Sequence, residues 1–536
     1  MSASGIPFRK TGYFSSLICD YLDEVPHLKP FYNRFPNLEN FKLQIEEKQK
    51  SEQTNAAHRS TLVSVLQDQY KNVETSAETL INIAYLKNET TFTITTGHQL
   101  NLFTGPLYFL YKIISTINLS KALKETYPEY HFVPVYWMAT EDHDFDEINY
   151  FNFKGKKIQW NTNAQGAVGR LSTRGLAAVY DLFSMELGHT EIAKVLKNIF
   201  KTAYLEHDNL ANATRYLANE LFKDSGLVII DADSKRLKKL FVPFIEAELL
   251  KQTAFKAVTE TNNQINALAG GQYNIQVTPR EINLFYLAEN LRERIVLENG
   301  VYKVLNTKTH FTQAEILKEV NARPERFSPN VIMRPLYQEV VLPNLCYIGG
   351  GGEIAYWLQL KAFFNQVEVP FPVLLLRNSV LLQSEKQGEK LKKLNISETD
   401  IFLKRNAFIN KKVREISNID IDFSPQILHL KQQFEHLHAL ADQTDKSFLG
   451  AVKAQEAKQI KGLKNLEKRL LKAQKQKLKD QVSRMTELQN QLFPNQGLQE
   501  RNANFSEFYL EYGKRLTTSL IEGLDPLCGA FIVVEI

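Results

Sequence analysis

The densest group of reactive side chains in the sequence is an acidic block at residues 140–147 (TEDHDFDE). It directly follows the apolar run 132–139 (FVPVYWMA), which has the composition of a buried strand. So many carboxylates cannot all be buried without partners, so we expect them at the carboxyl end of that strand, facing a crevice. Such a group can coordinate Mg²⁺, act as a general base or hold a substrate ammonium, and the sequence leaves these three chemistries open. The alternative is a solvated acidic loop that caps the next element. The candidate residues of this block are Glu141, Asp142, His143 and Asp144.

A second group, Gly97-His98-Gln99, follows the β-branched run 91–96 (TFTITT) and precedes a helix-type stretch at 107–123. A glycine turn after a strand places backbone N–H groups and a helix N-terminus at the sheet edge where anions and nucleotides bind. We expect Gly97 and Gln99 to help bind the ligand, and His98 to donate to a phosphate oxygen during nucleotidyl transfer. The alternative is that Gly97 only makes the turn and His98 caps the helix. The sequence contains neither GxGxxG nor GxxxxGK[ST], which excludes a dinucleotide fingerprint and a P-loop.

A third group combines a polar stretch at 328–338 with four consecutive glycines at 349–352. The glycines allow close backbone approach to a ligand, and a helix from Ile354 would present amides that favour an anion. An arginine in the polar stretch can bind a carboxylate or phosphate bidentately. A plain flexible loop is the alternative for the glycine run. The candidate binding residues are Asn330, Arg334, Tyr337, Gly350, Gly351 and Glu353.

The elements that must position these groups follow a strand, glycine turn, helix, strand order, which is the βαβ pattern of a parallel sheet. Short apolar runs at 226–230 and 372–376 fit the same sheet. Asn299-Gly300 lies between two strand-type runs and predicts a β-hairpin. We therefore predict an α/β protein with a Rossmann-like parallel core, interrupted by helical and hairpin insertions.

Composition divides the chain into six predicted segments. Two of them, 89–155 and 331–385, form the first and second parts of the core, and 1–88 is a mainly helical segment packing on it. The segment 156–330 holds helical and hairpin insertions with interspersed core strands. The segment 386–497 is predicted to be a coiled-coil domain, and 498–536 returns to the core. Leucine and methionine at 471, 478, 485 and 492 repeat every seven residues in a long helix, which we expect to pair antiparallel with an earlier helix near 427–441.

The net charge of +5 belongs to one segment, because residues 453–479 carry ten Lys/Arg against two acids. This pattern is typical of a solvated coiled-coil exterior and makes nucleic-acid binding an unfavoured alternative. No apolar run approaches the roughly 18 residues of a membrane span, and no secretory signal is recognised. Three widely spaced cysteines (Cys19, Cys346, Cys528) exclude a disulfide framework and suit a reducing cytoplasm.

Several long motifs together resemble the bacillithiol-biosynthesis cysteine-adding enzyme family, BshC, over essentially the whole chain. These are TTGHQLNLFTGPLYFLYK (95–112), WMATEDHDFDEIN (137–149) and FSPNVIMRPLYQ with LPNLCYIGGGGEIAYWLQLK (327–361). GYFSSLICDYL (12–22) and LQERNANFSEFYLEYG (498–513) are similar to that family too.

The resemblance implies a Rossmann-like core related to class I aminoacyl-tRNA synthetases and a coiled coil used for homodimerisation. It implies an amide ligase that joins L-cysteine to glucosaminyl-malate. Gly97-His98-Gln99 stands where synthetases carry HIGH, without matching it, and no KMSKS occurs. These departures leave open whether cysteine is activated as an adenylate or through another nucleotide or phosphoryl donor. ATP or ADP is the expected nucleotide, and no metal is assigned. The alternatives are a nucleotidyl transferase with another substrate and a coiled-coil RNA-binding or scaffold protein.

Overall fold

The structure is a computed structural model that describes residues 2–52 and 55–536. The chain forms two compact units. The core unit comprises Met1–Leu381 and Gln499–Val534, and the helical unit comprises Leu382–Leu498 with Glu535–Ile536.

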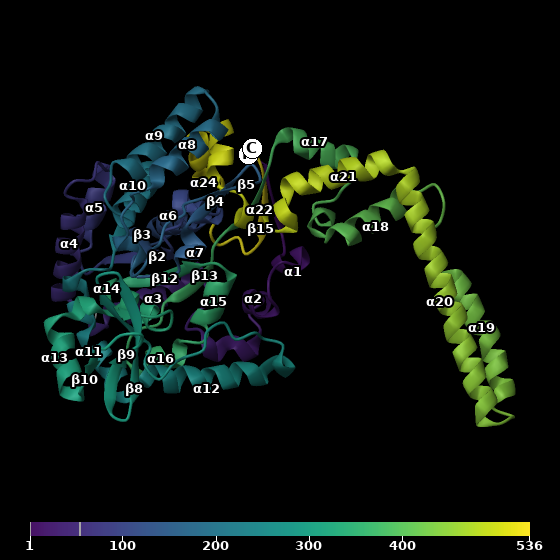
Figure 1. Ribbon diagram of the computed structural model, residues 1–536, viewed down its shortest axis with the longest axis horizontal. Helices are drawn as coiled ribbons and strands as arrows, with labels where there is room; N and C mark the ends of the chain where they lie inside the picture. The colour runs from purple at the N-terminus through teal and green to yellow at the C-terminus, as the bar shows by residue number, and fades with distance from the viewer. Residues whose placement is uncertain (1, 53–54) are drawn as a thin grey trace. The chain divides into compact units, whose positions relative to one another are not determined.

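A five-stranded parallel sheet of order β13-β12-β2-β3-β6 organises the core unit (Figure 1). The strand order reverses between β2 and β12, so the carboxyl ends of these two strands flank the switch point where ligands bind in open α/β sheets. The predicted Rossmann-like parallel core is confirmed. The strands are β2 (Thr91–His98), β3 (His131–Met138), β6 (Val228–Asp231), β12 (Asn344–Gly349) and β13 (Val373–Leu376).

Strand β2 is longer than the sequence predicted. Gly97 does not end the strand, because parallel pairing with β3 continues through Gly97 opposite Trp137 and His98 opposite Met138. The next helix, α6 (Tyr108–Thr126), begins only after a short 3-10 turn at Leu102–Thr104. The helix expected at 107–123 is thus confirmed, whereas the expected strand end at Gly97 is wrong, and so is the alternative in which His98 caps that helix.

The core of this unit lies between α6 and the sheet. Fully buried side chains of β2, β12 and β13, such as Phe92, Ile348 and Val373, pack with Leu119 and Leu123 of α6. Burying a side chain of this size contributes about 1.5–3 kcal/mol, so this contact fixes α6 against the strands that carry the site.

The insertions contain helices and a second sheet of order β10-β9-β8-β7-β11. Strands β8 (Leu291–Glu298) and β9 (Val301–Val304) pair antiparallel around Asn299 and Gly300, which both have positive φ. The predicted hairpin is confirmed, since this turn favours residues that tolerate the left-handed region. The other strands and helices between β3 and residue 330 are α7 (Phe145–Ile148), β4 (Tyr150–Phe153), β5 (Lys156–Gln159), α8 (Leu176–Leu187), α9 (Glu191–Leu205), α10 (Leu210–Phe222), α11 (Lys235–Lys251), α12 (Thr253–Ala267), β7 (Leu284–Ala288), β10 (His310–Phe311), α13 (Gln313–Ala322) and β11 (Phe327–Pro329).

The remaining elements of the core unit are mostly short helices. Near the N-terminus these are β1 (Ser2–Ile6), α1 (Phe8–Thr11), α2 (Ser16–Leu22), α3 (Leu38–Gln49), α4 (Ala56–Tyr70) and α5 (Ala77–Tyr85). Later in the chain come α14 (Met333–Val341), α15 (Gly351–Trp357), α16 (Lys361–Gln366), β14 (Ser379–Gln383), α22 (Gln499–Asn502), α23 (Phe505–Tyr512), α24 (Arg515–Gly523) and β15 (Phe531–Glu535).

The helical unit contains α17 (Glu385–Lys393), α18 (Arg405–Ile416), α19 (Ser424–Ala441), α20 (Lys446–Lys477) and α21 (Lys479–Leu492). Helices α19 and α20 lie side by side as the predicted antiparallel pair (Figure 1). The long helix is interrupted at Leu478, so the seven-residue repeat does not run along one continuous helix. Among the described residues, no helix is both long and apolar enough to cross a membrane.

One short antiparallel partner helix would leave the heptad leucines partly exposed, as a stripe open to a second chain, but the structure does not show such a stripe. Leu471 is 8% exposed and Leu492 is fully buried, because neighbouring helices of the same unit cover them. The exposed apolar side chains lie elsewhere on α19 and α20, at Leu428, Leu437, Leu440, Phe448 and Leu466.

Candidate active site

A cavity of about 980 Å³ opens at the carboxyl ends of β2, β3 and β12. It brings together most of the side chains that the sequence singled out from segments far apart in the chain. Those lining it are Gly97, His98, Gln99, Glu141, Asp142, His143, Asp144, Asn330, Arg334, Tyr337, Gly350 and Glu353. Gly351 is not among the lining residues; a Cβ there would meet Ile18 instead.

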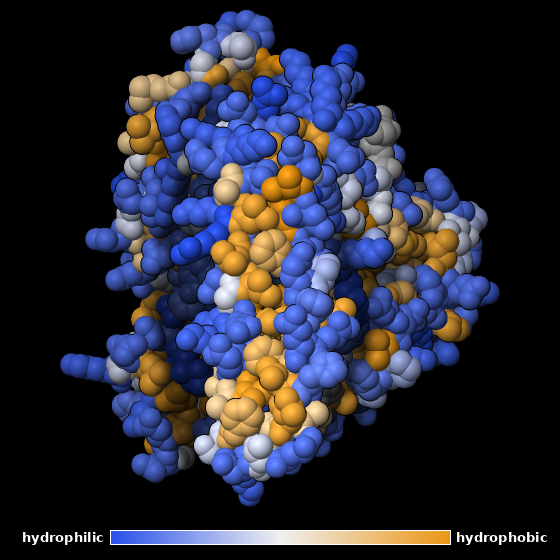
Figure 2. Space-filling model, turned by 90° about the vertical axis from the view of Figure 1, so that its right-hand side faces the viewer, coloured by the Kyte–Doolittle hydropathy of each residue, from blue (hydrophilic) through white to orange (hydrophobic). Residues whose placement is uncertain are grey.

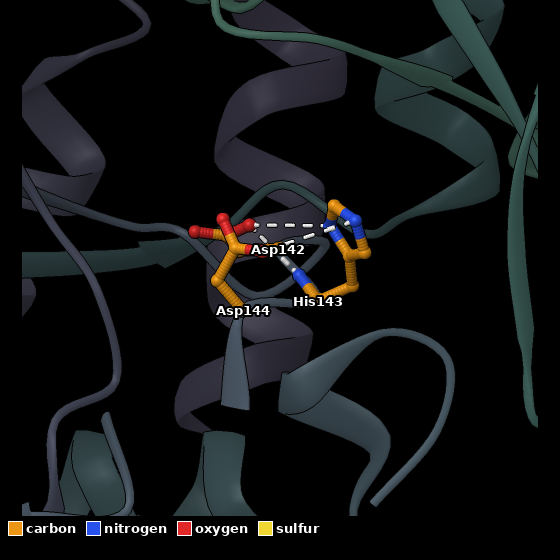
Figure 3. A group of neighbouring side chains, drawn as sticks. All are labelled: Asp142, His143 and Asp144. Atoms are coloured by element: carbon orange, nitrogen blue, oxygen red, sulfur yellow. Dashed lines mark hydrogen bonds and ion pairs between the residues drawn. The ribbon is translucent and has the colours of Figure 1, made fainter. Parts of the chain in front are cut away.

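One side of the cavity, the acidic wall, consists of Glu141, Asp142, His143 and Asp144. Figure 3 shows the last three of these side chains. Asp142 accepts hydrogen bonds from Gln99 Nε2 at 2.9 Å and from the backbone N–H of His143 at 2.8 Å. Burial alone would raise the pKa of Asp142, but these bonds and the charge of Arg292 lower it to about 2. Asp142 is therefore a permanent carboxylate at neutral pH.

The other two carboxyl groups of the acidic wall hold their protons more tightly. Burial raises the pKa of Glu141 to about 7, although Lys238 Nζ lies 2.5 Å from it and favours the ionised form. Burial, followed by the negative charge of Asp142, raises the pKa of Asp144. Neighbouring carboxyl groups thus differ in basicity, which is the arrangement expected where one binds charge and another transfers protons.

His143 is held by an arginine from the hairpin insertion. Arg292 Nη1 lies 2.6 Å from His143 Nδ1, while the guanidinium stacks 3.9 Å from the ring centre of Phe285. A guanidinium has only donors, so Nδ1 accepts in this contact, which places the ring hydrogen on Nε2. His143 can therefore donate a hydrogen bond from Nε2.

The same contact bears on metal binding. Ligand atoms of Asp142, His143 and Asp144 lie within 4.8 Å of one another, a spacing that suits a metal ion. The guanidinium of Arg292 occupies one imidazole nitrogen and places a permanent positive charge beside the group. One ligand atom of this group is thus already engaged, and the added positive charge opposes a divalent cation at the acidic wall.

His98 lies at the end of β2 and is only 7% exposed. Its ring packs against Tyr108 and Phe109, and its Nε2 is buried without a hydrogen-bond partner among the described residues. Burial and the charge of Lys112 lower the pKa of His98 to about 3, so the ring is neutral at neutral pH. Its contribution to ligand binding is therefore a hydrogen bond and not a positive charge.

Opposite charges collect at the switch point, where Lys112, Arg334 and Arg377 form what we call the cationic floor. Lys112 Nζ donates to the carbonyl of Gly97 at 2.8 Å and lies 2.5 Å from Glu353 Oε2. Burial would raise the pKa of Glu353, but Lys112 and Tyr347 lower it to about 2. This ion pair, with Lys112 buried and Glu353 partly buried, joins the end of β2 to the start of α15.

The glycine run differs from the prediction. Helix α15 begins at Gly351, not Ile354, and none of the four glycines has positive φ. The side chain of Glu353 accepts from the backbone N–H of Gly350 at 2.9 Å, so a carboxylate of the chain itself occupies the expected anion position. The run instead gives close packing, since a Cβ at Gly349 would lie 2.9 Å from that of Glu353.

The two arginines of the cationic floor have different surroundings. Arg334 donates to neutral acceptors, Gln338 Oε1 at 3.1 Å and the hydroxyl of Tyr356 at 3.3 Å. Arg377 binds Glu500 bidentately at 2.9 and 2.8 Å, and its Nε is buried without a partner among the described residues. Unused donor capacity of this kind suits a phosphate or carboxylate.

Two predicted binding residues use their polar atoms within the protein. Asn330 Oδ1 accepts from the backbone N–H groups of Ile332 and Met333, and its Nδ2 donates to Asn283. The hydroxyl of Tyr337 donates to the carbonyl of Ala232. Both side chains line the cavity, and in this structure both also shape its wall.

Sequence reasoning missed Lys112, Arg292, Arg377 and Arg501, which also line the cavity. One signal was available, because Lys112 is the only charged residue in the otherwise neutral stretch 108–120 of a helix buried nearly all round. A charge in such a place needs a partner or a function. The three arginines lie in segments that only the fold brings to this cavity.

Comparison with known proteins identifies the family. The model of the family "Bacillithiol biosynthesis BshC" matches in two parts, its N-terminal Rossmann-like domain over residues 1–378 and its C-terminal coiled-coil domain over 380–536. A protein of Flavobacterium johnsoniae named "Putative cysteine ligase BshC" is 59% identical, with 100% of both chains covered. Proteins of the same name from Christiangramia forsetii and Staphylococcus saprophyticus are 58% and 30% identical. They cover 100% and 88% of this chain, and 99% and 90% of the relatives. The chain therefore belongs to the BshC family of bacillithiol biosynthesis.

Proposed function

We propose that the chain is a cysteine ligase that forms an amide between the carboxyl group of L-cysteine and the amine of glucosaminyl-malate. The observation that carries the proposal is one cavity with an acidic wall and a cationic floor, in a chain whose relatives are named cysteine ligases. An amine and an acidic group must both be bound in this reaction, and the two sides of the cavity offer the matching charges.

Amide formation from a free carboxylate needs activation, because a carboxylate oxygen is a poor leaving group. The activating reagent is a nucleotide, ATP or ADP, whose phosphoryl or nucleotidyl group takes up one carboxylate oxygen and departs with it when nitrogen attacks. The buried, unpartnered Nε of Arg377 and the free donors of Arg334 fit a phosphate at the cationic floor. His98 and the end of β2 lie beside it and complete the phosphate contacts.

The acidic wall serves the attacking amine. Asp142 stays ionised, which suits holding the glucosaminyl ammonium, whereas a carboxylate of such low basicity is a poor proton acceptor. Asp144 is exposed and its pKa is raised, so it is the better group to accept the proton that nitrogen loses on attack. His143 donates a hydrogen bond from Nε2. Glu141 forms an ion pair with the buried Lys238, which fixes the position of the wall.

We also propose a homodimer formed through the helical unit, in the cytoplasm. Figure 2 shows hydrophobic residues gathered in a band along the face that carries α19 and α20. The exposed side chains Leu428, Leu437, Leu440, Phe448 and Leu466 belong to these helices. An apolar band of this kind on a surface helix pair favours burial against another chain.

The test is a turnover assay of the purified full-length chain with L-cysteine, glucosaminyl-malate and ATP or ADP, followed by mass spectrometry of the thiol product. We expect the amide product only when all three components are present. Product formation without cysteine would indicate a nucleotidyl transferase of another kind. Absence of product, together with salt-dependent RNA binding that is lost on neutralising the lysines of 453–479, would favour the scaffold alternative.

A further inference from the structure

A second, smaller cavity of about 270 Å³ adjoins the main one. The two share four lining residues, Gln99, Tyr108, Glu147 and Arg501, which form a neck between them. Pockets for drug-sized ligands span about 300–1,000 Å³, so the main cavity suits glucosaminyl-malate and a nucleotide, and the smaller one suits a smaller molecule.

Charges of both signs meet at this neck. Glu147 is exposed and accepts from Gln99 Nε2 at 3.0 Å, while the same Nε2 donates to Asp142 of the acidic wall. The amide of Gln99 thus bridges two carboxylates, that of Asp142 in the main cavity and that of Glu147 at the neck. The exposed guanidinium of Arg501 lies 5.9 Å from the ring centre of Tyr108. A carboxylate and a guanidinium at one opening complement a zwitterion.

The floor of the small cavity carries an unused acceptor. Asn101 is 7% exposed; its Nδ2 donates to the carbonyl of Glu147 at 3.2 Å, and its Oδ1 has no hydrogen-bond partner among the described residues. A buried acceptor without a donor is costly unless a ligand or water satisfies it. Gly105 keeps this place open, because it has a φ of +63° and a Cβ there would lie 2.6 Å from Asn101 Cβ.

The remaining lining is partly apolar and includes Pro106 and Phe151. We propose that the small cavity is the subsite for the α-amino acid substrate, L-cysteine. Glu147 and the Oδ1 of Asn101 bind its ammonium, Arg501 binds its carboxylate, and its thiol side chain enters the space beside Pro106 and Phe151. The inference rests on the proposed ligase function. It leaves the acidic wall of the main cavity free for the glucosaminyl amine, which then meets the cysteine carboxylate at the neck.

The first test measures steady-state kinetics of Glu147→Gln and Arg501→Gln in the full-length chain. Removing one charged partner of a substrate typically weakens binding about ten- to a hundredfold, so KM for cysteine should rise by that factor. KM for glucosaminyl-malate should change less than about threefold. Matched controls are Asp146→Asn, a neighbour of Glu147 that lines neither cavity, and Arg515→Gln on α24, both exposed. An unchanged KM for cysteine in both test variants overturns the subsite while leaving the ligase function standing.

The second test separates this inference from the proposed function, because it needs no turnover. Calorimetric titration of the wild-type chain uses L-cysteine, cysteamine, which lacks the carboxylate, and 3-mercaptopropionate, which lacks the ammonium. We expect L-cysteine to bind most tightly, with Glu147→Gln weakening L-cysteine but not 3-mercaptopropionate, and Arg501→Gln weakening L-cysteine but not cysteamine. Binding of L-cysteine that both variants leave intact overturns the subsite, and so does absence of cysteine binding with or without the nucleotide. A wild-type chain that binds cysteine in this pattern but makes no amide keeps the subsite and overturns the proposed function.

Discussion

The acidic wall and the cationic floor face the same cavity but differ in their contact with water. On the wall, the side chains of His143 and Asp144 are 41% and 54% exposed; on the floor, those of Lys112 and Arg377 are 5% and 2% exposed. Exposed charged pairs contribute about 0–1 kcal/mol to folding, whereas breaking a buried pair costs about 3–5 kcal/mol. His143 and Asp144 of the wall can therefore be altered at little cost in stability, whereas Arg377 of the floor cannot. A loss of activity on substitution therefore reports on chemistry mainly when the substituted residue is an exposed one of the wall, because the fold is then unaffected.

The largest effect should come from Asp144→Asn on the wall. Loss of a general base lowers the rate by about 10²–10⁴-fold, and the melting temperature should hardly move because the side chain is exposed. Since the raised pKa of Asp144 requires a higher pH for ionisation, kcat of the wild type should increase with pH as this proton is lost, and the variant should lack that increase.

Asp146→Asn is the matched control for this variant, with turnover expected near the wild-type value. Near-normal turnover of Asp144→Asn would show that the wall is a solvated cap. Unfolding of the variant would show instead that the wall is a structural network.

The floor should respond in the opposite way. Arg377→Ala leaves the buried carboxylate of Glu500 without its partner, so the free energy of unfolding should fall by about 3–5 kcal/mol in urea denaturation. The double variant Arg377→Met with Glu500→Leu should recover most of this loss, because it removes both charges. It should still be inactive if Arg377 contacts phosphate. A single variant as stable as the wild type would contradict the assignment of a buried pair.

Most of the fold was predictable from sequence, because strand composition and glycine placement are local signals. The parallel core, the Asn299-Gly300 hairpin and the α19–α20 pair all follow from such signals. The end of β2 could not be predicted from local signals, because Gly97 remains paired with Trp137, a residue 40 positions away in the chain. The interruption at Leu478 and the burial of Leu471 likewise depend on packing within the helical unit.

Of the two sides of the candidate site, the acidic wall could be predicted from the sequence and most of the cationic floor could not. The residues of the wall are neighbours in the sequence and directly follow a strand, so they are recognisable as a cluster of carboxylates. The residues of the floor come from three separate elements, α6, α14 and the loop after β13. No spacing in the sequence links Arg377 to Glu500, which are 123 residues apart. Predicting such a pair requires the fold that brings the two segments together.

Arg292→Gln tests whether Arg292 controls His143 of the acidic wall. Removing the guanidinium frees His143 Nδ1, so the imidazole can bind a metal through this nitrogen. We expect kcat/KM to fall about ten- to a hundredfold, the loss typical of one hydrogen bond to a charged group. Zn²⁺ should inhibit the variant more strongly than the wild type. Arg292→Lys, which keeps a donor and the charge, should stay closer to the wild type in both measurements; equal Zn²⁺ inhibition of all three proteins would contradict control of His143 by Arg292.

The smallest effect on turnover should come from substitutions in the helical unit. There, exposed leucines should affect dimerisation and buried leucines should affect stability. Leu437 and Leu440 are 40% and 57% exposed on α19, so replacing both with Glu should convert the dimer to monomers in light scattering. Surface substitutions usually change the free energy of unfolding by less than about 0.5 kcal/mol, and the variant should unfold nearly as the wild type does. Leu471→Glu is the matched contrast, because this leucine is 8% exposed and a buried glutamate should destabilise the helical unit strongly. A wild-type chain that is already monomeric, or a double variant of unchanged dimeric mass, would show that the apolar band of α19 and α20 does not hold two chains together.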